Sequence, residues 1–528
     1  MKKMAGSGNK SGARAVKTVA LMMGATVLAK LLGMLRSVLQ ANAYGTTAEA
    51  NAFTAASKLP LAFFDMFLAA AVLGCFIPVY NSFREKDADR VTSPEADRFA
   101  CVFLNFIILL CGVLAAVGMI FAEPFIGLIT TDLDASTMAL AVTLTRIMFP
   151  LVLFTGSAYT LVGVLQSKGS FIAPALISAV SNAGVVLYLA FFNAPLGKWG
   201  IYGLAAAYLL SWLSQLLTLV VPLWRQGFRY KLLFDFKNPA LIRAMKMAPP
   251  IMIGSWLAPA GTLIGQHFAS LVAADAGIAG ATTVFDYANN IYIIIAGTLT
   301  YSICNYTFPK ISRLSANGSG AEFAATVRNG LKSALFIVVP FMAAALVLAG
   351  EGTAVVYLRG AFTPEDAFNT AKALRFILPA MPFFCVTELF SRVFYSMNQP
   401  RIPMYAALAG ITAKLITGVV LTGTGLFDIG AVGAANAAGQ IASAAVLLGF
   451  AAKRTKGLLT ASFALDILKI ILGGAIVFAI CFSLRMLTAS DPYTASFMTN
   501  VWKAALSFLP AAAAYLAYAK LARIRFAG

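Results

Sequence analysis

Long apolar stretches recur along the whole chain, and they constrain its fold more than any other feature of the sequence. A helix of about 20 mostly apolar residues can cross the hydrocarbon core of a membrane, which is about 30 Å thick. Hydrophobic residues make up 60% of the 528 residues, against about 45–50% in soluble domains. We therefore expect an all-α polytopic membrane protein with about 14 transmembrane helices. The stretches lie near residues 18–40, 52–80, 99–121, 138–165, 172–192, 201–223, 247–271, 282–308, 330–349, 371–397, 402–424, 429–452, 463–487 and 499–519.

The distribution of basic residues predicts how these helices are oriented. Short cytoplasmic loops collect Lys and Arg. If the N-terminus lies inside, the inner segments hold 27 of the 40 Lys and Arg residues, and the outer loops hold three together with acids such as Glu351. This split predicts an even number of helices with both termini inside. The basic inner segments account for most of the net charge of +19. A nucleic-acid-binding protein would gather its basic residues on a polar face, whereas here they interrupt long apolar runs, so we expect no nucleic-acid partner.

Cysteine and histidine usage limits the chemistry that the chain can carry. All six cysteines lie in apolar runs and none forms a CxxC pair, so we expect them to be small buried side chains. The single histidine, His267, cannot supply a multi-histidine metal site, and we interpret it as a hydrogen-bonded packing residue. We therefore expect no metal, no cofactor and no enzymatic activity.

An internal repeat predicts how the chain is divided. We expect two tandem lobes of six helices each, at residues 1–228 and 229–452, followed by two further helices in residues 453–528. Both lobes begin inside, so the repeats are parallel. Two such lobes enclose a cavity near the bilayer midplane and rock against each other, which favours a transporter. The matches, at offsets of 229 and then 231, are 146–150 with 375–379, Ser167 with Ser396, Pro174 with Pro403, and 76–78 with 307–309.

Ionisable residues inside the apolar stretches are candidates for function. Burying one in a spanning helix costs about 2.5–3.5 kcal/mol on insertion scales, so it usually serves a function or has a partner. The excess of bases over acids suits an anionic substrate, particularly a phosphate. Alternatively, the bases pair with buried acids, as the four-residue spacing of Glu388 and Arg392 allows, or lie at helix ends. The bases are Lys30, Arg36, Lys58, Arg146, Arg375, Arg392 and Lys414, and the acids are Asp65, Asp286 and Glu388.

Three further bases, Lys469, Arg485 and Lys503, lie near the predicted ends of helices. Long basic side chains at such positions commonly extend toward the membrane surface and keep their charge in water. We therefore leave them out of the candidate site.

Several short motifs resemble, in their order and spacing, the sequences of a known transporter family. Together they resemble the MurJ (MviN) lipid II flippases of the multidrug/oligosaccharidyl-lipid/polysaccharide exporter superfamily. The resemblance covers nearly the whole chain and includes the fourteen-helix count. The motifs are 29–36 (AKLLGMLR), Tyr44-Gly45, 51–53 (NAF), 58–60 (KLP), 76–78 (FIP), 360–363 (GAFT) with Asp366, 392–396 (RVFYS) and Pro403.

This resemblance implies a function, a location and a set of partners. The family moves lipid II, an undecaprenyl-pyrophosphate-linked disaccharide-pentapeptide, from the inner to the outer leaflet of the bacterial cytoplasmic membrane. It does so by alternating access through a cationic central cavity. Its last two helices, here residues 453–528, border a hydrophobic groove for the lipid tail. The implied partners are lipid II or a similar polyprenyl-pyrophosphate glycolipid, membrane lipids and the machinery of cell-wall synthesis.

The resemblance also assigns roles to residues. Lys30 and Arg36 match basic cavity residues of the family's first helix, and Lys58 matches its Lys-Leu-Pro motif. We expect Lys30, Arg36, Lys58, Arg392 and Lys414 to bind the substrate. The expected supporting residues are Asn51, Asp65, Arg146, Asp286, Asn290, Arg375 and Glu388.

The chain departs from the family pattern at several of these places. Asn51 and Ser37 stand where acids are common, and Phe64 and Asp65 stand where an arginine is common. In the eighth predicted stretch, 282–308, Tyr287 or Asn290 stands where the family commonly has an arginine. The departures leave open a flippase for another polyprenyl-linked glycan. A cation-coupled drug exporter is disfavoured, because its cargoes are commonly cationic whereas the spans hold more bases than acids. A scaffold for envelope assembly is a further alternative, and it would tolerate charge reversal at the basic residues.

Overall fold

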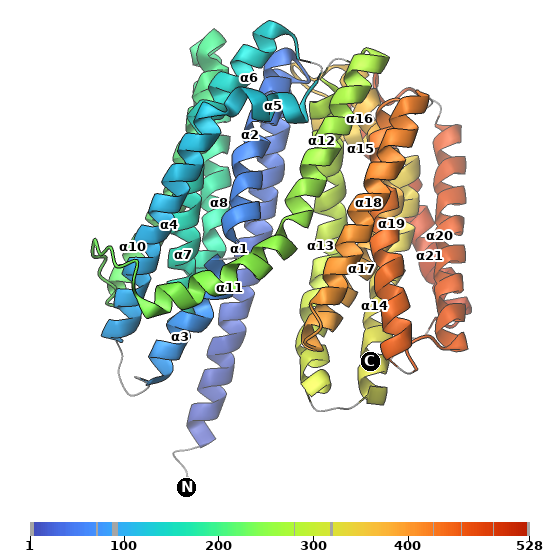
Figure 1. Ribbon diagram of the computed structural model, residues 1–528. Coiled ribbons are helices and arrows are strands. Elements are labelled where there is room, and N and C mark those ends of the chain that lie inside the picture. The colour runs from blue at the N-terminus through green and yellow to red at the C-terminus, as the bar shows by residue number, and fades with distance from the viewer. Residues whose placement is uncertain are drawn as a thin grey trace. The chain divides into compact units, whose positions relative to one another are not determined.

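The computed structural model describes residues 5–69, 72–86, 93–131, 133–278, 280–316, 320–425, 427–455, 457–488 and 490–524 (Figure 1). Every regular element in these ranges is helical, and none is a strand. Eleven helical segments among them are long and apolar enough to cross a membrane. The prediction of an all-α, multi-spanning protein is therefore confirmed. The count of 14 helices and the placement of both termini inside stay predictions.

Two of the predicted spans change geometry along their length. In the stretch 52–80, the α-helix ends at Phe64, just after Pro60, and π-helical turns follow from Asp65. Pro60 has no backbone N–H, so it removes one hydrogen bond of the helix. In the stretch 247–271, Trp256 separates two helices. The eleven candidates include neither of these two stretches.

The contacts between helices divide the chain into two compact units. Unit 1 runs to Ala43 and from Ala48 to Leu263. Within it, α8 packs on α10, α2 on α6, and α4 on α7. Its elements are α1 (Ala5–Tyr44), α2 (Ala48–Phe64), η1 (Asp65–Ala69), η2 (Val72–Phe76), α3 (Ile77–Lys86), α4 (Pro94–Ile120), α5 (Ala122–Ile129), α6 (Ala135–Met148), α7 (Leu151–Ser167), α8 (Ile172–Leu187), η3 (Tyr188–Phe192), α9 (Asn193–Leu196), η4 (Gly197–Trp199), α10 (Gly200–Arg225) and α11 (Pro239–Ser255).

Unit 2 comprises Tyr44–Thr47 and the chain from Ile264 onward. Here α18 packs on α19, and α14 packs on α20, which in turn packs on α21. Its elements are α12 (Leu257–Ala276, which begins in unit 1), α13 (Ala281–Ala316), α14 (Gly320–Val347), α15 (Ala349–Tyr357), α16 (Pro364–Ile377), η5 (Leu378–Ala380), α17 (Met381–Ser396), α18 (Arg401–Thr424), α19 (Ile429–Arg454), α20 (Ala461–Leu487) and α21 (Phe497–Leu521).

The unit boundary lies at Leu263 rather than at residue 228, because α11 packs on η1, η2 and α4 of unit 1. Contacts define the units, whereas the expected boundaries at 228 and 452 rest on sequence repetition. The division into 1–228, 229–452 and 453–528 therefore stays a prediction.

The turns that follow α7 and α17 are built in the same way. Ser167 and Ser396 are the last residues of their helices. After them, Gly169 and Asn398 both have a positive φ, of 79° and 56°. The following N–H groups, of Ser170 and Gln399, donate to the carbonyls of residues 165 and 394, at 2.8 and 2.9 Å. All of these pairs lie 229 residues apart in the sequence.

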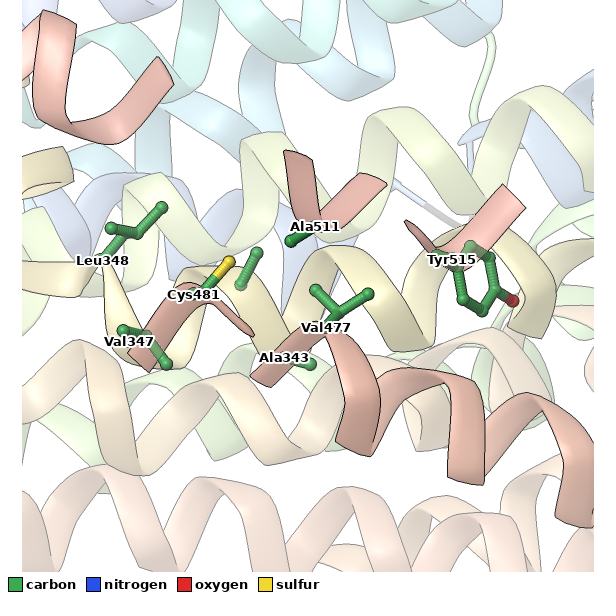
Figure 2. Packing of buried hydrophobic residues seen from close by; sticks show 8 residues of the cluster. Ala343, Val347, Leu348, Val477, Cys481, Ala511 and Tyr515 are labelled. Atoms are coloured by element: carbon green, nitrogen blue, oxygen red, sulfur yellow. The ribbon is translucent and has the colours of Figure 1, made fainter. Parts of the chain in front are cut away.

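The last two helices are fixed onto α14. Figure 2 shows the apolar cluster between them, in which Val477 and Cys481 of α20 and Ala511 and Tyr515 of α21 meet α14 residues such as Val347. The Tyr515 hydroxyl donates to a backbone carbonyl of α14 at 2.9 Å. All six cysteines are buried and free, as the sequence predicts.

The three bases predicted to lie near helix ends have contacts or burial within the protein. The Arg485 Nε donates to Glu351 Oε1 at 2.6 Å, and the Lys503 Nζ is buried. Lys469 donates to the carbonyl of Ala522 at 2.9 Å. Glu351 was expected in an open outer loop, but it lies in α15 and is 2% exposed. Arg485 therefore neutralises a buried acid while its own side chain stays partly exposed.

Candidate functional site

The first helix of unit 1 carries Arg36 against an aromatic ring. The Arg36 guanidinium carbon lies 5.4 Å from the centre of the Tyr208 ring, which belongs to α10. Tyr208 in turn meets Phe53 of α2 edge-on, with ring centres 5.1 Å apart. The Arg36 Nε is buried and has no hydrogen-bond acceptor among the described residues. The described contact of the guanidinium is thus an aromatic ring, and its buried Nε keeps an unused hydrogen-bonding capacity.

The helix around Lys30 is held by α8. The Asn182 amide donates to the carbonyl of Ala29 at 3.2 Å and to that of Ser178 at 2.9 Å. Lys30 itself is half-buried. These contacts fix the backbone that presents Lys30, and they join α1 to the same unit as Tyr208 and Phe53.

The second helix presents Asn51 and Lys58 on one face. Residues seven apart in an α-helix are separated by two turns and point the same way. Asn51 is buried and Lys58 is half-buried. Asp65 is exposed and begins the π-helical η1. Single π-helical turns frequently occur at functional sites, so the end of α2 is a second place where unit 1 offers ionisable groups.

In unit 2, Arg392 lies in a polar cluster on α13 and α17. Its Nη2 is 3.8 Å from Glu388 Oε2, which confirms the ion pair expected from their spacing. Its Nη1 donates to Asn305 Oδ1 at 2.7 Å. The guanidinium also lies 5.8 Å from the centre of the Tyr301 ring. Arg392 is therefore partly neutralised inside unit 2, unlike Arg36, whose described partner is an uncharged ring.

Lys414 is buried among α12, α18 and α19. Its Nζ donates to Asn436 Oδ1 at 3.4 Å. A Cβ added to Gly265 would lie 2.9 Å from that Nζ, so the glycine leaves the room that the ammonium fills. Lys414 is 8% exposed. On α13, Asn290 donates to Asp286 at 3.3 Å, so these two supporting residues pair along one helix.

Arg146 and Arg375 lie in the last turns of α6 and α16. Arg146 is exposed and its Nε donates to the carbonyl of Met119 at 3.2 Å, near the end of α4. Arg375 is half-buried near Tyr493. Burial raises the pKa of the Tyr493 phenol above its ordinary value, and the positive charge of Arg375 opposes that shift. Both arginines are placed at helix ends, as the alternative interpretation of these bases expects.

Two of the sequence motifs meet in unit 2. Gly45 has a φ of 52°, and a Cβ there would lie 2.3 Å from the carbonyl oxygen of Ala361, so only glycine fits. The hydroxyl of Thr46 donates to Asp366. Asp366 also accepts from the backbone N–H of Thr363 at 2.8 Å and forms a capping box at the start of α16. The turn Tyr44–Thr47 is thereby tied to the motif at 360–366.

Several partners of the candidate residues were not expected from the sequence. Tyr208 and Phe53 support Arg36, whereas Tyr301, Asn305 and Asn436 contact Arg392 or Lys414. All of them are uncharged and lie on other helices. Because they carry no charge, nothing in the sequence distinguishes these residues from other residues of the apolar stretches.

Among the described residues, eleven helical segments are long and apolar enough to cross a membrane and several carry basic side chains, which is the arrangement of a multi-pass membrane protein. The family model described as "Lipid II flippase MurJ" matches residues 40–506. The chain therefore belongs to the MurJ family of lipid II flippases. The family resemblance stated from the motifs is confirmed.

Individual relatives and solved structures agree with this assignment. A probable lipid II flippase MurJ of Bdellovibrio bacteriovorus is 27% identical over 472 residues, which cover 88% of this chain and 87% of the relative. One of Rickettsia prowazekii is 22% identical over 388 residues, covering 73% and 74%.

The fold also matches solved transporters. The structure titled "Lipid II flippase MurJ, inward closed conformation" has a TM-score of 0.77 and 22% identity, covering 95% of this chain and 99% of the other. An inward-facing multidrug resistance MATE family transporter of the MOP superfamily has a TM-score of 0.68 and 15% identity, covering 84% and 99%. At these identities the likeness is one of fold.

Proposed function

We propose that this protein is a lipid II flippase of the bacterial cytoplasmic membrane. Its cargo is the undecaprenyl-pyrophosphate-linked disaccharide-pentapeptide, which it moves from the inner to the outer leaflet by alternating access. The match of the family model to residues 40–506 carries this proposal. We further propose that 14 helices cross the membrane with both termini inside, and that the protein acts as a transporter and not as an enzyme.

The chemistry of unit 1 supports a pyrophosphate cargo. Arg36 carries a permanent charge, rests on the Tyr208 ring and keeps a buried Nε donor that no described residue occupies. Guanidinium groups donate two parallel hydrogen bonds to phosphate oxygens, and such charge-assisted bonds are about twice as strong as neutral ones. We assign Arg36 the main contact with the pyrophosphate and Lys30 and Lys58 auxiliary contacts.

The roles of the unit 2 residues follow from their partners. Arg392 already shares its charge with Glu388, and Lys414 is buried beside Asn436. We assign Arg392 to a weaker, adjustable contact with the head group and Lys414 to positioning α18 and α19. Asn51 and Asp65 support Lys58, whereas Asp286 and Asn290 support the α13 face. Arg146 and Arg375 hold helix ends.

The energy for the transport cycle comes from a source other than nucleotide hydrolysis, because the sequence has no P-loop motif. Moving one charge through a potential of 100 mV is worth about 2.3 kcal/mol, which is enough to bias a transport cycle. The membrane potential, an ion gradient or consumption of the product outside supplies this bias.

Genetic complementation tests the proposal. We expect the protein to restore growth and cell shape to a bacterium depleted of its own lipid II flippase. A variant with Lys30, Arg36 and Lys58 all changed to Gln should fail to do so at equal membrane abundance, because the cationic contacts to the pyrophosphate are gone. Restored growth by that triple variant, or no growth with the wild-type protein at normal abundance, would count against the proposal.

A further inference from the structure

The segment between α10 and α11 is drawn green in Figure 1. Side chains of α4 hold it by hydrogen bonds to the backbone of the segment. The Asn105 amide of α4 donates to the carbonyls of Lys231 and Leu233, at 3.3 and 2.9 Å. The Tyr230 hydroxyl donates back to Asn105 Oδ1 at 2.6 Å. Carbonyls two residues apart point the same way in an extended backbone. The segment therefore runs extended across α4, with two of its carbonyls satisfied by a side chain that is 2% exposed.

The apolar side chains of this segment share one face and are exposed. In an extended segment, residues two apart lie on the same side, which places Leu232 and Phe234 together. The Tyr230 hydroxyl also reaches Asn105, and the centre of the Phe236 ring lies 6.5 Å from that of Phe106 on α4. Tyr230, Leu232, Phe234 and Phe236 are 47%, 69%, 58% and 50% exposed. Large apolar side chains are exposed along many helices of this membrane protein, but this row stands on an irregular segment between helices and beside basic residues.

Basic residues flank this apolar row on both sides, and Lys231 lies within it. Between residues 225 and 246 the chain has six bases and one acid, Asp235. Trp224, at the end of α10, is 60% exposed, and exposed tryptophans are typical of the boundary between hydrocarbon and water. Lys231 and Lys237 are exposed. The six bases are Arg225, Arg229, Lys231, Lys237, Arg243 and Lys246.

We propose that residues 224–246 form an interfacial anchor that binds anionic phospholipid head groups. The row from Tyr230 to Phe236 enters the interfacial layer, while the neighbouring bases contact lipid phosphates. A bilayer surface fits better than a protein partner, because it offers apolar chains directly beneath a layer of negative charge. Six bases against one acid give the charge complementarity. The anchor fixes α4 and α11 at the membrane surface, and it is independent of the cargo.

Lipid retention by the purified full-length protein tests this anchor. Native mass spectrometry would count phosphatidylglycerol and phosphatidylcholine of matched chains bound during titration in detergent. The variant Lys231→Gln/Lys237→Gln should reduce the preference for phosphatidylglycerol on the order of tenfold, because each base near a charged surface contributes measurably to attraction. The control Lys453→Gln/Lys520→Gln removes two exposed lysines elsewhere and should keep the preference. An unchanged preference in the first variant, or an equal loss in both, would overturn the proposal.

A second measurement asks what covers the apolar row. A fluorophore attached to Leu232→Cys in vesicles of phosphatidylglycerol and phosphatidylcholine reports its surroundings; the six native cysteines are buried. We expect quenchers carried on lipid chains to reduce its emission more than aqueous iodide does. Stronger quenching by iodide, or shielding from both quenchers, would place the row in water or against protein and contradict a lipid anchor.

Discussion

Replacing Arg36 by Ala is expected to slow lipid II translocation about 10- to 100-fold. Charge-assisted hydrogen bonds contribute about 1.5–3 kcal/mol each, and this change removes those that Arg36 makes to a phosphate. It also leaves Tyr208 and Phe53 in contact, so α10 and α2 should stay packed. Translocation by the reconstituted variant, measured in vesicles against the wild-type protein, gives the ratio directly.

Two companion variants separate charge from geometry at this position. Arg36→Lys keeps the charge but loses the planar donor set, so we expect intermediate translocation. Arg225→Ala removes an exposed arginine at the end of α10 and should leave translocation unchanged. If Arg36→Ala translocates lipid II at the wild-type rate while folded, the assigned phosphate contact is wrong. An equal loss in Arg225→Ala would show that total charge, and not Arg36, matters.

Replacing Arg485 by Met is expected to destabilise the protein by about 3–5 kcal/mol. The change leaves Glu351 as an uncompensated charge in a site where it is 2% exposed. The Arg485 side chain is 26% exposed, so it can find water when its partner is removed. Glu351→Gln alone should therefore cost less, about 1–2 kcal/mol. The melting temperatures of the purified variants in detergent rank these effects.

The double variant Arg485→Met/Glu351→Leu makes this prediction specific to the ion pair. Removing both charges should recover most of the loss, because well-packed apolar residues often replace a buried pair at little cost. The more exposed pair Lys372–Asp428, at 2.5 Å with side chains 31% and 39% exposed, is the matched control, and Lys372→Met should cost at most about 1 kcal/mol. A double variant as unstable as Arg485→Met would show that lost packing is responsible.

The sequence was sufficient to predict the class of fold and the approximate bounds of several helices. Hydropathy and charge are read along the chain, so spans such as 429–452 agree with α19 (Ile429–Arg454). The pair Glu388–Arg392 was predictable because both residues lie one helical turn apart.

Contacts between distant helices could not be predicted in this way. Arg36 and Tyr208 are far apart in the sequence. A tyrosine that contacts an arginine cannot be told from a tyrosine that only packs when both lie in apolar stretches. Glu351 falls between the predicted spans 330–349 and 371–397, which assigns it to a loop, yet α15 buries it against Arg485. Hydropathy assigns a residue to a segment, but only the packing of α15 on its neighbours decides its partner.

Lipid II translocation by the purified wild-type protein in vesicles decides whether the protein is a flippase for this cargo. A probe added outside would follow the fraction of lipid II head groups that become accessible over time. If the protein is a lipid II flippase, accessibility should rise much faster than in protein-free vesicles and faster than with the Lys30, Arg36 and Lys58 triple variant. Accessibility that rises no faster than in protein-free vesicles, with folded protein present, would contradict it.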